Sequence, residues 1–325
     1  GWTIIELVAT ANDGYRFVAW DDDNTENPRQ ITVLEDATYT AIFEAIPTYD
    51  ITVNITGNGT VTYNGEAVED AETITVREGE NVALSMVANA NNIIASVIVD
   101  ETNNVTESLV NGVYTFENVM ASHSIDITFI PTYNITVNIA GNGSVTYNGE
   151  AVENAEVITV TEGENVALTI VANDNNRIAN VIVDGTNNVT ESLVDDVYTF
   201  ENVTANHNIG ITFVPTYDIT LNIAGNGSVT YNGEAVENAE VITLTEGETA
   251  SFTISAATDN RLVSVIVDGT NNVTESLVDG VYTFENIMAN HSLDVTFEGI
   301  PTYDIIVNII GSGSVSHNGD ELENA

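Results

Sequence analysis

Residues 131–149 read PTYNITVNIAGNGSVTYNG, and apolar side chains alternate with polar side chains along most of this stretch. In Ile135-Thr136-Val137-Asn138-Ile139 the aliphatic side chains fall on one face, because successive side chains of a strand point to opposite faces. This period of two predicts a half-buried strand. Gly141-Asn142-Gly143 supplies the positive-φ residues of a tight turn, residues 144–147 form the returning strand, and Asn148-Gly149 is a hairpin signal.

The same stretch returns along the chain at a nearly constant interval. Pro47-Thr48-Tyr49 recurs from Pro131, Pro215 and Pro301, at spacings of 84, 84 and 86 residues, followed by Asp or, at Asn134, by Asn. Internal repeats of this kind determine the architecture of a chain. We predict a partial repeat at 1–46, complete repeats at 47–130, 131–214 and 215–300, and the first strands of a fourth repeat at 301–325.

Further short strands are predicted within each repeat. In the second repeat they are Val157–Thr161, Val166–Ala172, Ile178–Val183, Val197–Phe200 and Ile209–Val214. No segment has a sustained helical period, although Glu201–His207 could form one short turn. About seven short strands in each repeat fit a β-sandwich, with a compact barrel as the alternative. The predicted fold is all-β, with tandem Ig-like β-sandwich repeats of about 84 residues arranged end to end.

The junctions between repeats are short. One residue separates Phe129 from Pro131 and Phe213 from Pro215, and proline stiffens the chain, so we expect these joints to be semi-rigid. The joints that follow Phe43 and Phe297 hold two more residues and should bend more. A folded unit of this size has a radius of gyration of about 12 Å, and a series of such units would form a rod on the order of 100 Å or more.

The charge balance is extreme. The 325 residues include 49 Asp and Glu but only 5 basic residues, all of them arginine, which gives a formal charge of −44. Such a surface repels nucleic acids and anionic lipids, so we expect neither as a partner, and no apolar run is long enough to insert into a membrane. The absence of lysine and cysteine excludes Lys–Asn isopeptide and thioester cross-links, and Gln30, the only glutamine, lies before the repeats.

Three groups of residues are candidates for site chemistry. His123, His207 and His291 recur once per repeat, and we interpret them as turn histidines that bond the backbone rather than as metal ligands. Asp21, Asp22 and Asp23 form the densest run of oxygen ligands, which fits either a calcium site or a simple turn. Ten sequons, including those at Asn54 and Asn134, predict an exposed surface. N-glycosylation, where the host performs it, is predicted at Asn58, Asn104, Asn142, Asn188, Asn202, Asn226, Asn272 and Asn290.

Two resemblances add to these predictions. Residues 47–325, with Tyr198-Thr199-Phe200-Glu201-Asn202-Val203 and the following Ala205-Asn206-His207, resemble tandem β-repeats of bacterial and archaeal surface proteins. Residues 1–46, with Gly14–Trp20 and Ala37–Phe43, are similar to the divergent internalin B-repeat type. The resemblance implies large secreted or cell-wall proteins in which such repeats act as stalks, and it carries no catalytic residues.

The two ends of the sequence suggest a second hypothesis. Aligned on Ala11-Asn12-Asp13 against Ala172-Asn173-Asp174, the N-terminal piece supplies the second part of a repeat. The C-terminal piece, which ends at Glu323-Asn324-Ala325, supplies the first part, and together they lack only the stretch that matches Val157–Thr161. The C-terminus of one copy could therefore complete the N-terminal half-repeat of another copy. A longer array from which this chain was taken is the competing explanation.

The sequence therefore predicts a non-catalytic structural shaft of an extracellular, cell-surface fibre or adhesin, with no cofactor other than calcium. The alternatives are a self-assembling filament subunit and a glycan- or protein-binding module. The expected partners are other copies of the chain, flanking domains of a longer chain, or a cell-surface ligand.

Overall fold

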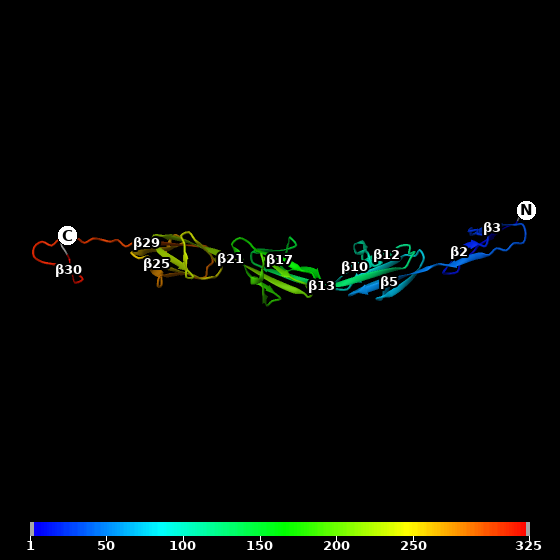
Figure 1. Ribbon diagram of the computed structural model, residues 1–325, viewed down its shortest axis with the longest axis horizontal. Helices are drawn as coiled ribbons and strands as arrows, with labels where there is room; N and C mark the ends of the chain where they lie inside the picture. The colour runs from blue at the N-terminus through cyan, green and yellow to red at the C-terminus, as the bar shows by residue number, and fades with distance from the viewer. Residues whose placement is uncertain (1–2, 323–325) are drawn as a thin grey trace. The chain divides into compact units, whose positions relative to one another are not determined.

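In the computed structural model of the protein, which describes residues 3–322, the regular secondary structure is β-strand apart from three single turns of 3-10 helix (Figure 1). The predicted all-β sandwich class is confirmed. The N-terminal segment contains β1 (Thr3–Leu7), β2 (Tyr15–Trp20), β3 (Arg29–Val33) and β4 (Ala41–Ala45). The C-terminal segment contains β30 (Val315–His317) and β31 (Asp320–Leu322). Glu323-Asn324-Ala325 lie outside the described residues.

The three complete repeats contain the same succession of short strands. Repeat 1 has β5 (Thr48–Thr56), β6 (Gly59–Tyr63), β7 (Glu66–Val68), β8 (Glu72–Arg77), β9 (Val82–Ala88), β10 (Asn92–Val99), β11 (Asn103–Asn104), η1 (Thr106–Ser108), β12 (Val113–Phe116) and the start of β13 (His123–Ala140). Repeat 2 continues β13 and adds β14 (Gly143–Tyr147), β15 (Glu150–Ala151), β16 (Glu156–Thr161), β17 (Val166–Ala172), β18 (Asn176–Val183), β19 (Asn187–Asn188), η2 (Thr190–Ser192), β20 (Val197–Phe200) and the start of β21 (His207–Ala224). Repeat 3 continues β21 and adds β22 (Gly227–Tyr231), β23 (Glu234–Val236), β24 (Val241–Thr245), β25 (Ala250–Ala256), β26 (Asn260–Val267), β27 (Asn271–Asn272), η3 (Thr274–Ser276), β28 (Val281–Phe284) and β29 (His291–Gly299).

The helical turn expected at Glu201–His207 was wrongly placed. Asn202 has a positive φ of 48°, and Val203 exchanges backbone hydrogen bonds with Gly163 and Glu164, which holds this segment in an extended form. The 3-10 turn instead occurs at Thr190–Ser192, before β20.

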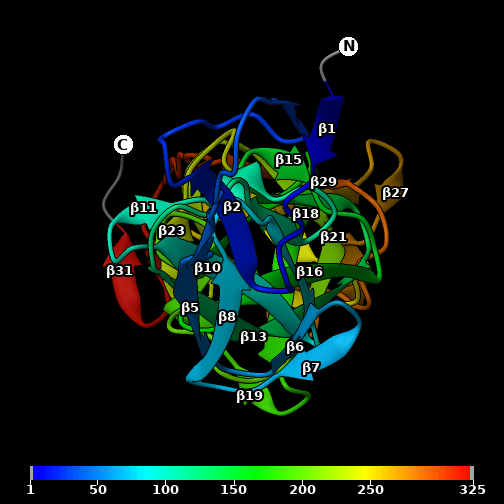
Figure 2. The same cartoon turned by 90° about the vertical axis from the view of Figure 1, so that its right-hand side faces the viewer.

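Repeat 1 illustrates the sandwich. One sheet has the strand order β8-β5-β13-β10-β11, with β5 and β8 side by side (Figure 2), and the other has the order β12-β9-β6-β7. The alternate residues of each strand face inward, and Ile51, Leu84, Ile125 and Ile127 are almost completely buried between the sheets. Burying each of these side chains contributes about 1.5–3 kcal/mol, so this apolar layer is the main source of stability.

The first and last strands of a repeat are parallel neighbours. In repeat 1, residues 51–56 of β5 pair with residues 123–128 of β13, and in repeat 3, residues 219–224 of β21 pair with residues 291–296 of β29. A chain whose first and last strands are parallel enters at one end of the sandwich and leaves at the opposite end. Each repeat therefore carries the chain forward along the strand direction.

Neighbouring repeats share a strand. After pairing with β5, β13 continues without a break and its residues 132–137 pair antiparallel with β16 in repeat 2. Ile51 lies opposite His123, and Ile135, its counterpart in the next repeat, lies twelve residues further along the same strand. At about 3.3 Å per residue, the distance between equivalent positions of repeats 1 and 2 is about 40 Å.

Packing, and not backbone conformation, explains the second glycine of the Gly-Asn-Gly turn. Gly141 has a φ of 86°, as predicted, but Gly143 is not in the left-handed region. A Cβ on Gly143 would instead lie 2.4 Å from the ring of Phe213, which packs flat against it. The sequence prediction that both glycines serve positive φ values was therefore wrong for Gly143.

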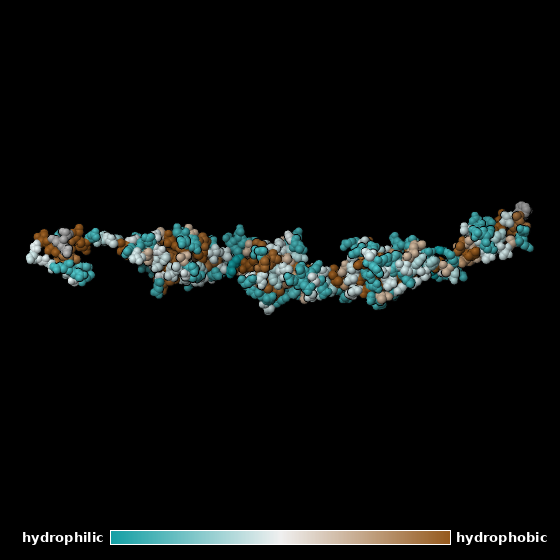
Figure 3. All heavy atoms as spheres, viewed as in Figure 1, coloured by the Kyte–Doolittle hydropathy of each residue, from teal (hydrophilic) through white to brown (hydrophobic). Residues whose placement is uncertain are grey.

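The C-terminal segment forms only its local hairpin. β30 and β31 pair across the Asn318-Gly319 turn, whereas residues 301–310, the counterpart of β5, form no strand. In the complete repeats this strand pairs with strands that lie further along the sequence, and no described residue supplies those partners here. Hydrophobic residues consequently gather on the surface of the C-terminal segment, at the left of Figure 3.

We predict that Gly143→Val lowers the free energy of unfolding of repeat 2 by about 1–3 kcal/mol, because the new side chain displaces the Phe213 ring. Hydrogen–deuterium exchange of repeat 2 peptides in urea measures this loss. Ser144→Val is the matched control, since it adds the same side chain at the neighbouring exposed position. Equal effects of the two substitutions would contradict the packing argument.

Candidate functional site

The repeated histidines bond a carboxylate and not the backbone, which corrects the sequence interpretation. His123 Nδ1 lies 2.7 Å from Asp100 Oδ2, and His291 Nδ1 lies 2.9 Å from Asp268 Oδ2. The Asp100 side chain also accepts a hydrogen bond from the Ser124 backbone N–H. No local sequence pattern indicates this pairing, because Asp100 and His123 are far apart in the chain and meet only when β10 pairs with β13.

Packing on an aromatic ring fixes each histidine as well. The ring centroids of His123 and Phe116 lie 5.2 Å apart, and those of His291 and Phe284 lie 5.1 Å apart. Among residues 3–322, no group of three or more His, Cys, Asp or Glu side chains is placed to hold a metal ion. In repeat 1 the His–Asp pair connects the end of β10 to the start of the last strand.

The same contacts lower the pKa of Asp100 and Asp268. Partial desolvation raises the pKa of each carboxyl, but hydrogen bonds from the paired histidine and from the next backbone N–H (Ser124 or Ser292) outweigh it. Because the folded-state pKa lies below the unfolded value of 3.8, ionised Asp100 and Asp268 contribute their full stabilisation of the folded state at any pH above 3.8. It is lost as the pH falls through the lower, folded-state pKa.

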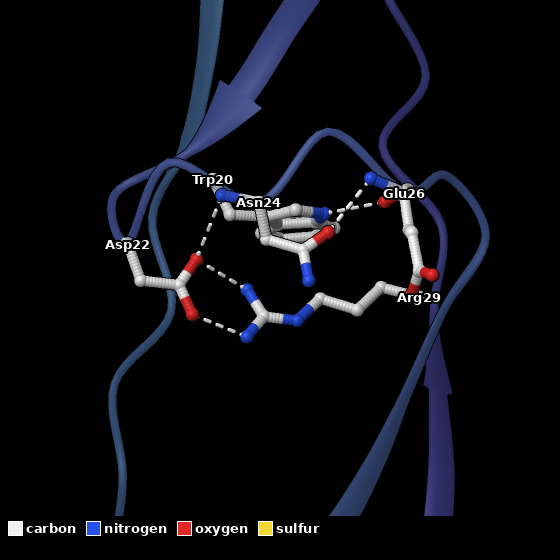
Figure 4. A network of polar contacts seen from close by, with 5 residues as sticks. All are labelled: Trp20, Asp22, Asn24, Glu26 and Arg29. Carbon is white, nitrogen blue, oxygen red and sulfur yellow. Dashed lines mark hydrogen bonds and ion pairs between the residues drawn. The ribbon is translucent and has the colours of Figure 1, made fainter.

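The acidic run at residues 21–23 belongs to a hydrogen-bonded loop after β2 (Figure 4). Both carboxylate oxygens of Asp22 accept hydrogen bonds from Arg29, at 2.6 Å for the Nη1–Oδ1 pair. Arg29 is buried, its guanidinium lies 4.7 Å from the centre of the Tyr39 ring, and it lowers the pKa of Asp22 by hydrogen bonding. Trp20 Nε1 donates to the Glu26 carbonyl over 2.8 Å.

This network bears on the calcium prediction. The Asp22 carboxylate already has a cationic partner, while Asp21 and Asp23 are exposed. The calcium interpretation of Asp21, Asp22 and Asp23 stays a prediction, and the structure adds that both carboxylate oxygens of Asp22 already accept hydrogen bonds from Arg29.

All eight asparagines predicted for N-glycosylation are exposed. At Asn104, Asn188 and Asn272 the amide oxygen accepts hydrogen bonds from both the N–H and the hydroxyl of the threonine two residues later. That threonine also accepts a bond from a backbone N–H of the neighbouring strand, as Thr106 does from Val97. These sequons therefore have a structural use in addition to any modification, which stays a prediction.

The sequence analysis missed two ion pairs that cross the joint after the N-terminal segment, Arg16–Glu78 and Arg77–Asp13. Arg16 contacts Glu44 at 2.6 Å and Glu78 at 2.5 Å, and Arg77 contacts Asp13 at 2.7 Å. Arg16 and Asp13 precede the joint, and Arg77 and Glu78 follow it, so the two pairs connect the N-terminal segment to repeat 1. The joint after Phe43, which was expected to bend more, is therefore bridged by ion pairs.

One apolar hollow lies on the N-terminal segment. Its volume is about 540 Å³, and Ile5, Leu7, Ile31, Val33 and Tyr39 contribute to its lining. No helix in the described part of the chain is long and apolar enough to cross a membrane.

Residues 3–47 match the family described as Divergent InlB B-repeat domain, which confirms the resemblance of the N-terminal piece. No curated protein matches the chain. Among solved structures, the chain is similar to the pilus adhesin SpaC of Lactobacillus rhamnosus GG (8% identity, TM-score 0.23, 83% of this chain and 46% of the adhesin). It is also similar to a streptococcal ancillary pilin (8%, 0.21, 77% and 99%) and to two B repeat units of the collagen binding protein of Staphylococcus aureus (10%, 0.13, 79% and 94%). The chain spans about half the length of SpaC, and TM-scores of this size carry no argument about function.

We predict that, as the pH falls below 3.8, repeats 1 and 3 lose stability more steeply than the Asp100→Asn, Asp268→Asn double variant does, because Asp100 and Asp268 become protonated whereas asparagine does not titrate. Thermal unfolding at a series of pH values measures the difference. Glu107→Gln, which removes an exposed carboxylate outside the pairs, is the control. Identical pH profiles for the double variant and the wild type would contradict the assignment.

If the loop at residues 21–23 takes calcium, the ion should raise the melting temperature of the N-terminal segment relative to the chelated protein. Asp21→Asn combined with Asp23→Asn should abolish this rise while leaving the Asp22–Arg29 pair intact. Tryptophan fluorescence follows the transition because Trp20 is buried beside the loop. The same melting temperature with calcium and with chelator would end the calcium interpretation.

Proposed function

We propose that the chain is a non-catalytic structural shaft of an extracellular surface fibre or adhesin, a spacer that holds another element away from a cell or particle. The observation that supports this proposal most is the strand shared by repeats 1 and 2. Because β13 serves both repeats, the chain gains about 40 Å of length for each repeat without a flexible linker. A protein whose task is to span a distance needs this property, and a catalyst does not.

The terminal strands also suit a protein under tension. Force applied to the two ends of a repeat pulls β5 and β13 in opposite directions along their length. The hydrogen bonds of the parallel pair lie across that direction, so all of them are loaded together and must break together. Asn54 adds a side-chain bond across the same pair, at 2.7 Å to Asp126.

The surface properties support an extracellular location. Exposed sequon asparagines, a net charge of −44 and a family match to the InlB B-repeat at the N-terminus all fit a protein outside the cell. Its partners in this proposal are flanking domains of a longer chain or other copies of the same chain. A self-assembling filament subunit is the second candidate.

Single-molecule force spectroscopy on the full chain tests the shaft. Each repeat of 84 residues should unfold as one step that lengthens the chain by about 250 Å, the extended length minus the folded advance of about 40 Å. We expect three such steps. Extension of the three repeats at negligible force and without steps would contradict the proposal.

A further inference from the structure

Repeats 1 and 3 fasten their last strand to their first strand with a side-chain bond. In repeat 1, Asn54 Nδ2 donates to Asp126 Oδ1 over 2.7 Å. In repeat 3, Asn222 Nδ2 donates to Asp294 Oδ1 over 2.5 Å. Each bond joins two residues that lie opposite each other in the parallel pair that closes the sandwich. The closing pair of these two repeats therefore has one bond more than its backbone supplies.

Repeat 2 lacks this bond because a glycine stands in its last strand. Gly210 in β21 is the counterpart of Asp126, and it has no side chain to accept a bond from Asn138, the counterpart of Asn54. Packing does not require the glycine, since a Cβ on Gly210 would meet nothing beyond its chain neighbours closer than the Ile182 carbonyl oxygen, at 3.9 Å. Its φ lies outside the left-handed region as well. Glycine inside a strand weakens the strand, because ordering its backbone costs more entropy.

The two-residue turn before β12, and its counterparts before β20 and β28, is the second difference. Repeats 1 and 3 have Asn111-Gly112 and Asp279-Gly280 there, with positive φ at both residues. Such turns favour Asn-Gly and Asp-Gly, because glycine takes the second positive φ at no steric cost. The space is also narrow, since a Cβ on Gly112 would lie 2.6 Å from the Met86 carbonyl oxygen.

Repeat 2 has Asp195-Asp196 in the same turn. Their φ values are 50° and 62°. The Ile170 N–H donates to the Asp196 carbonyl over 2.8 Å, the same length as the counterpart bond in repeat 1. The turn therefore keeps its position but carries a side chain where the other two repeats have none. A residue other than glycine is strained at this φ, and two adjacent carboxylates repel each other.

The third difference lies on the other side of the last strand. In repeat 2, Arg177 of β18 lies opposite Val214 of β21, so a cation lies beside an aliphatic side chain. The counterpart pairs are two isoleucines in repeat 1 and an ion pair in repeat 3, namely Ile93–Ile130 and Arg261–Glu298. Matched cross-strand pairs stabilise a sheet. β21 therefore has a weaker side-chain partner than its counterparts on both β13 and β18.

The buried core does not compensate for these differences. Ile135 and Leu168 of repeat 2 are fully buried, and so are their counterparts in repeat 1, Ile51 and Leu84. The apolar layers of the two repeats are therefore alike, and the closing strand and the turn decide the difference in stability. Because the net stability of a folded unit is a small difference between large terms, changes of this kind determine which repeat opens first.

We propose that repeat 2 is the least stable of the three complete repeats and opens first under load, as an extensible element between two repeats that stay folded. Force along the chain acts on the pair of first and last strands, which is where repeat 2 lacks the Asn–Asp bond. Opening repeat 2 alone lengthens the chain by one step of about 250 Å. The mechanical part of this inference rests on the proposed shaft role, whereas the order of stability does not.

Hydrogen–deuterium exchange of the full chain in moderate urea measures the order of stability without force. Amides of a core strand exchange when their repeat opens, so their rate follows the fraction of that repeat that is open. Residues 166–172 of β17 should exchange about five- to tenfold faster than residues 82–88 and 250–256 of the counterpart strands β9 and β25.

Substitutions in both directions identify the cause. Gly210→Asp should slow the exchange of repeat 2 about fivefold, and more than Gly210→Ala, which improves the strand without restoring the bond. Adding Asn138→Ala to Gly210→Asp should remove this additional gain, which separates the bond from the new charge. Asp196→Gly should slow the exchange of repeat 2 by itself. The mirror change, Asp126→Gly, should speed the exchange of repeat 1.

Force spectroscopy then tests the mechanical role. In the wild type, the first of the three steps should come at a lower force than the other two, and in the Gly210→Asp, Asp196→Gly double variant it should rise to meet them. Exchange of repeat 2 no faster than that of repeats 1 and 3, or an unchanged rate after Gly210→Asp, would overturn the order of stability. Three wild-type steps at one force would overturn the mechanical role and leave the shaft intact, whereas extension without steps would contradict both.

Discussion

Six residues of β5 lie alongside six residues of β13 that are 72 positions further along the chain, and this parallel pair closes repeat 1. The pair places the two ends of the repeat at opposite ends of the sandwich, and it leaves β13 free to continue as the first strand of repeat 2. It also supplies the position from which Phe129 reaches the two glycines. Residues 301–310, the counterpart of β5 in the C-terminal segment, form no strand.

Charge has a different role from packing in this molecule. The acidic residues outnumber the basic ones by almost ten to one, so most carboxylates have no cation to pair with. The ion pairs at Arg16, Arg77 and Arg261 lie at exposed sites, where such pairs contribute little to stability. The folded state therefore depends on the aliphatic layer between the sheets. The acidic surface repels other anionic surfaces, and added salt screens this repulsion.

Much of the fold could be predicted from the sequence because the signals were local. The alternation in Ile135–Ile139 and the exact return of the Pro-Thr-Tyr motif predicted the strands, and Val166–Ala172 and Val197–Phe200 match β17 and β20 residue for residue. The missed features all depend on contacts between distant residues. The ring that excludes a side chain at Gly143 comes from Phe213, 70 residues away, and the carboxylate bonded to His123 comes from the end of another strand.

The sequence predicted which residues could form candidate sites, but not the partners that these residues contact. Exposure of the sequon asparagines follows from polar turn sequences, but the Asn104–Thr106 bonds depend on the neighbouring strand. The acidic run at residues 21–23 was evident, whereas its partner Arg29 could not be assigned without the fold of the loop. The sequence predicted a short joint at Pro131. The structure shows that this joint is part of one continuous strand, because β13 pairs with β10 before Pro131 and with β16 after it.

One uninterrupted strand joins repeats 1 and 2. The distance between equivalent residues of the two repeats tests this directly. Thr73 and Val157 occupy equivalent exposed positions of β8 and β16, and the chain has no native cysteine, so spin labels can be attached after Thr73→Cys and Val157→Cys. Electron–electron double resonance should give one narrow distance distribution centred near about 40 Å, the advance of twelve residues of extended strand. A broad distribution, or one centred far below this value, would show that the strand is broken at the boundary and would contradict the account.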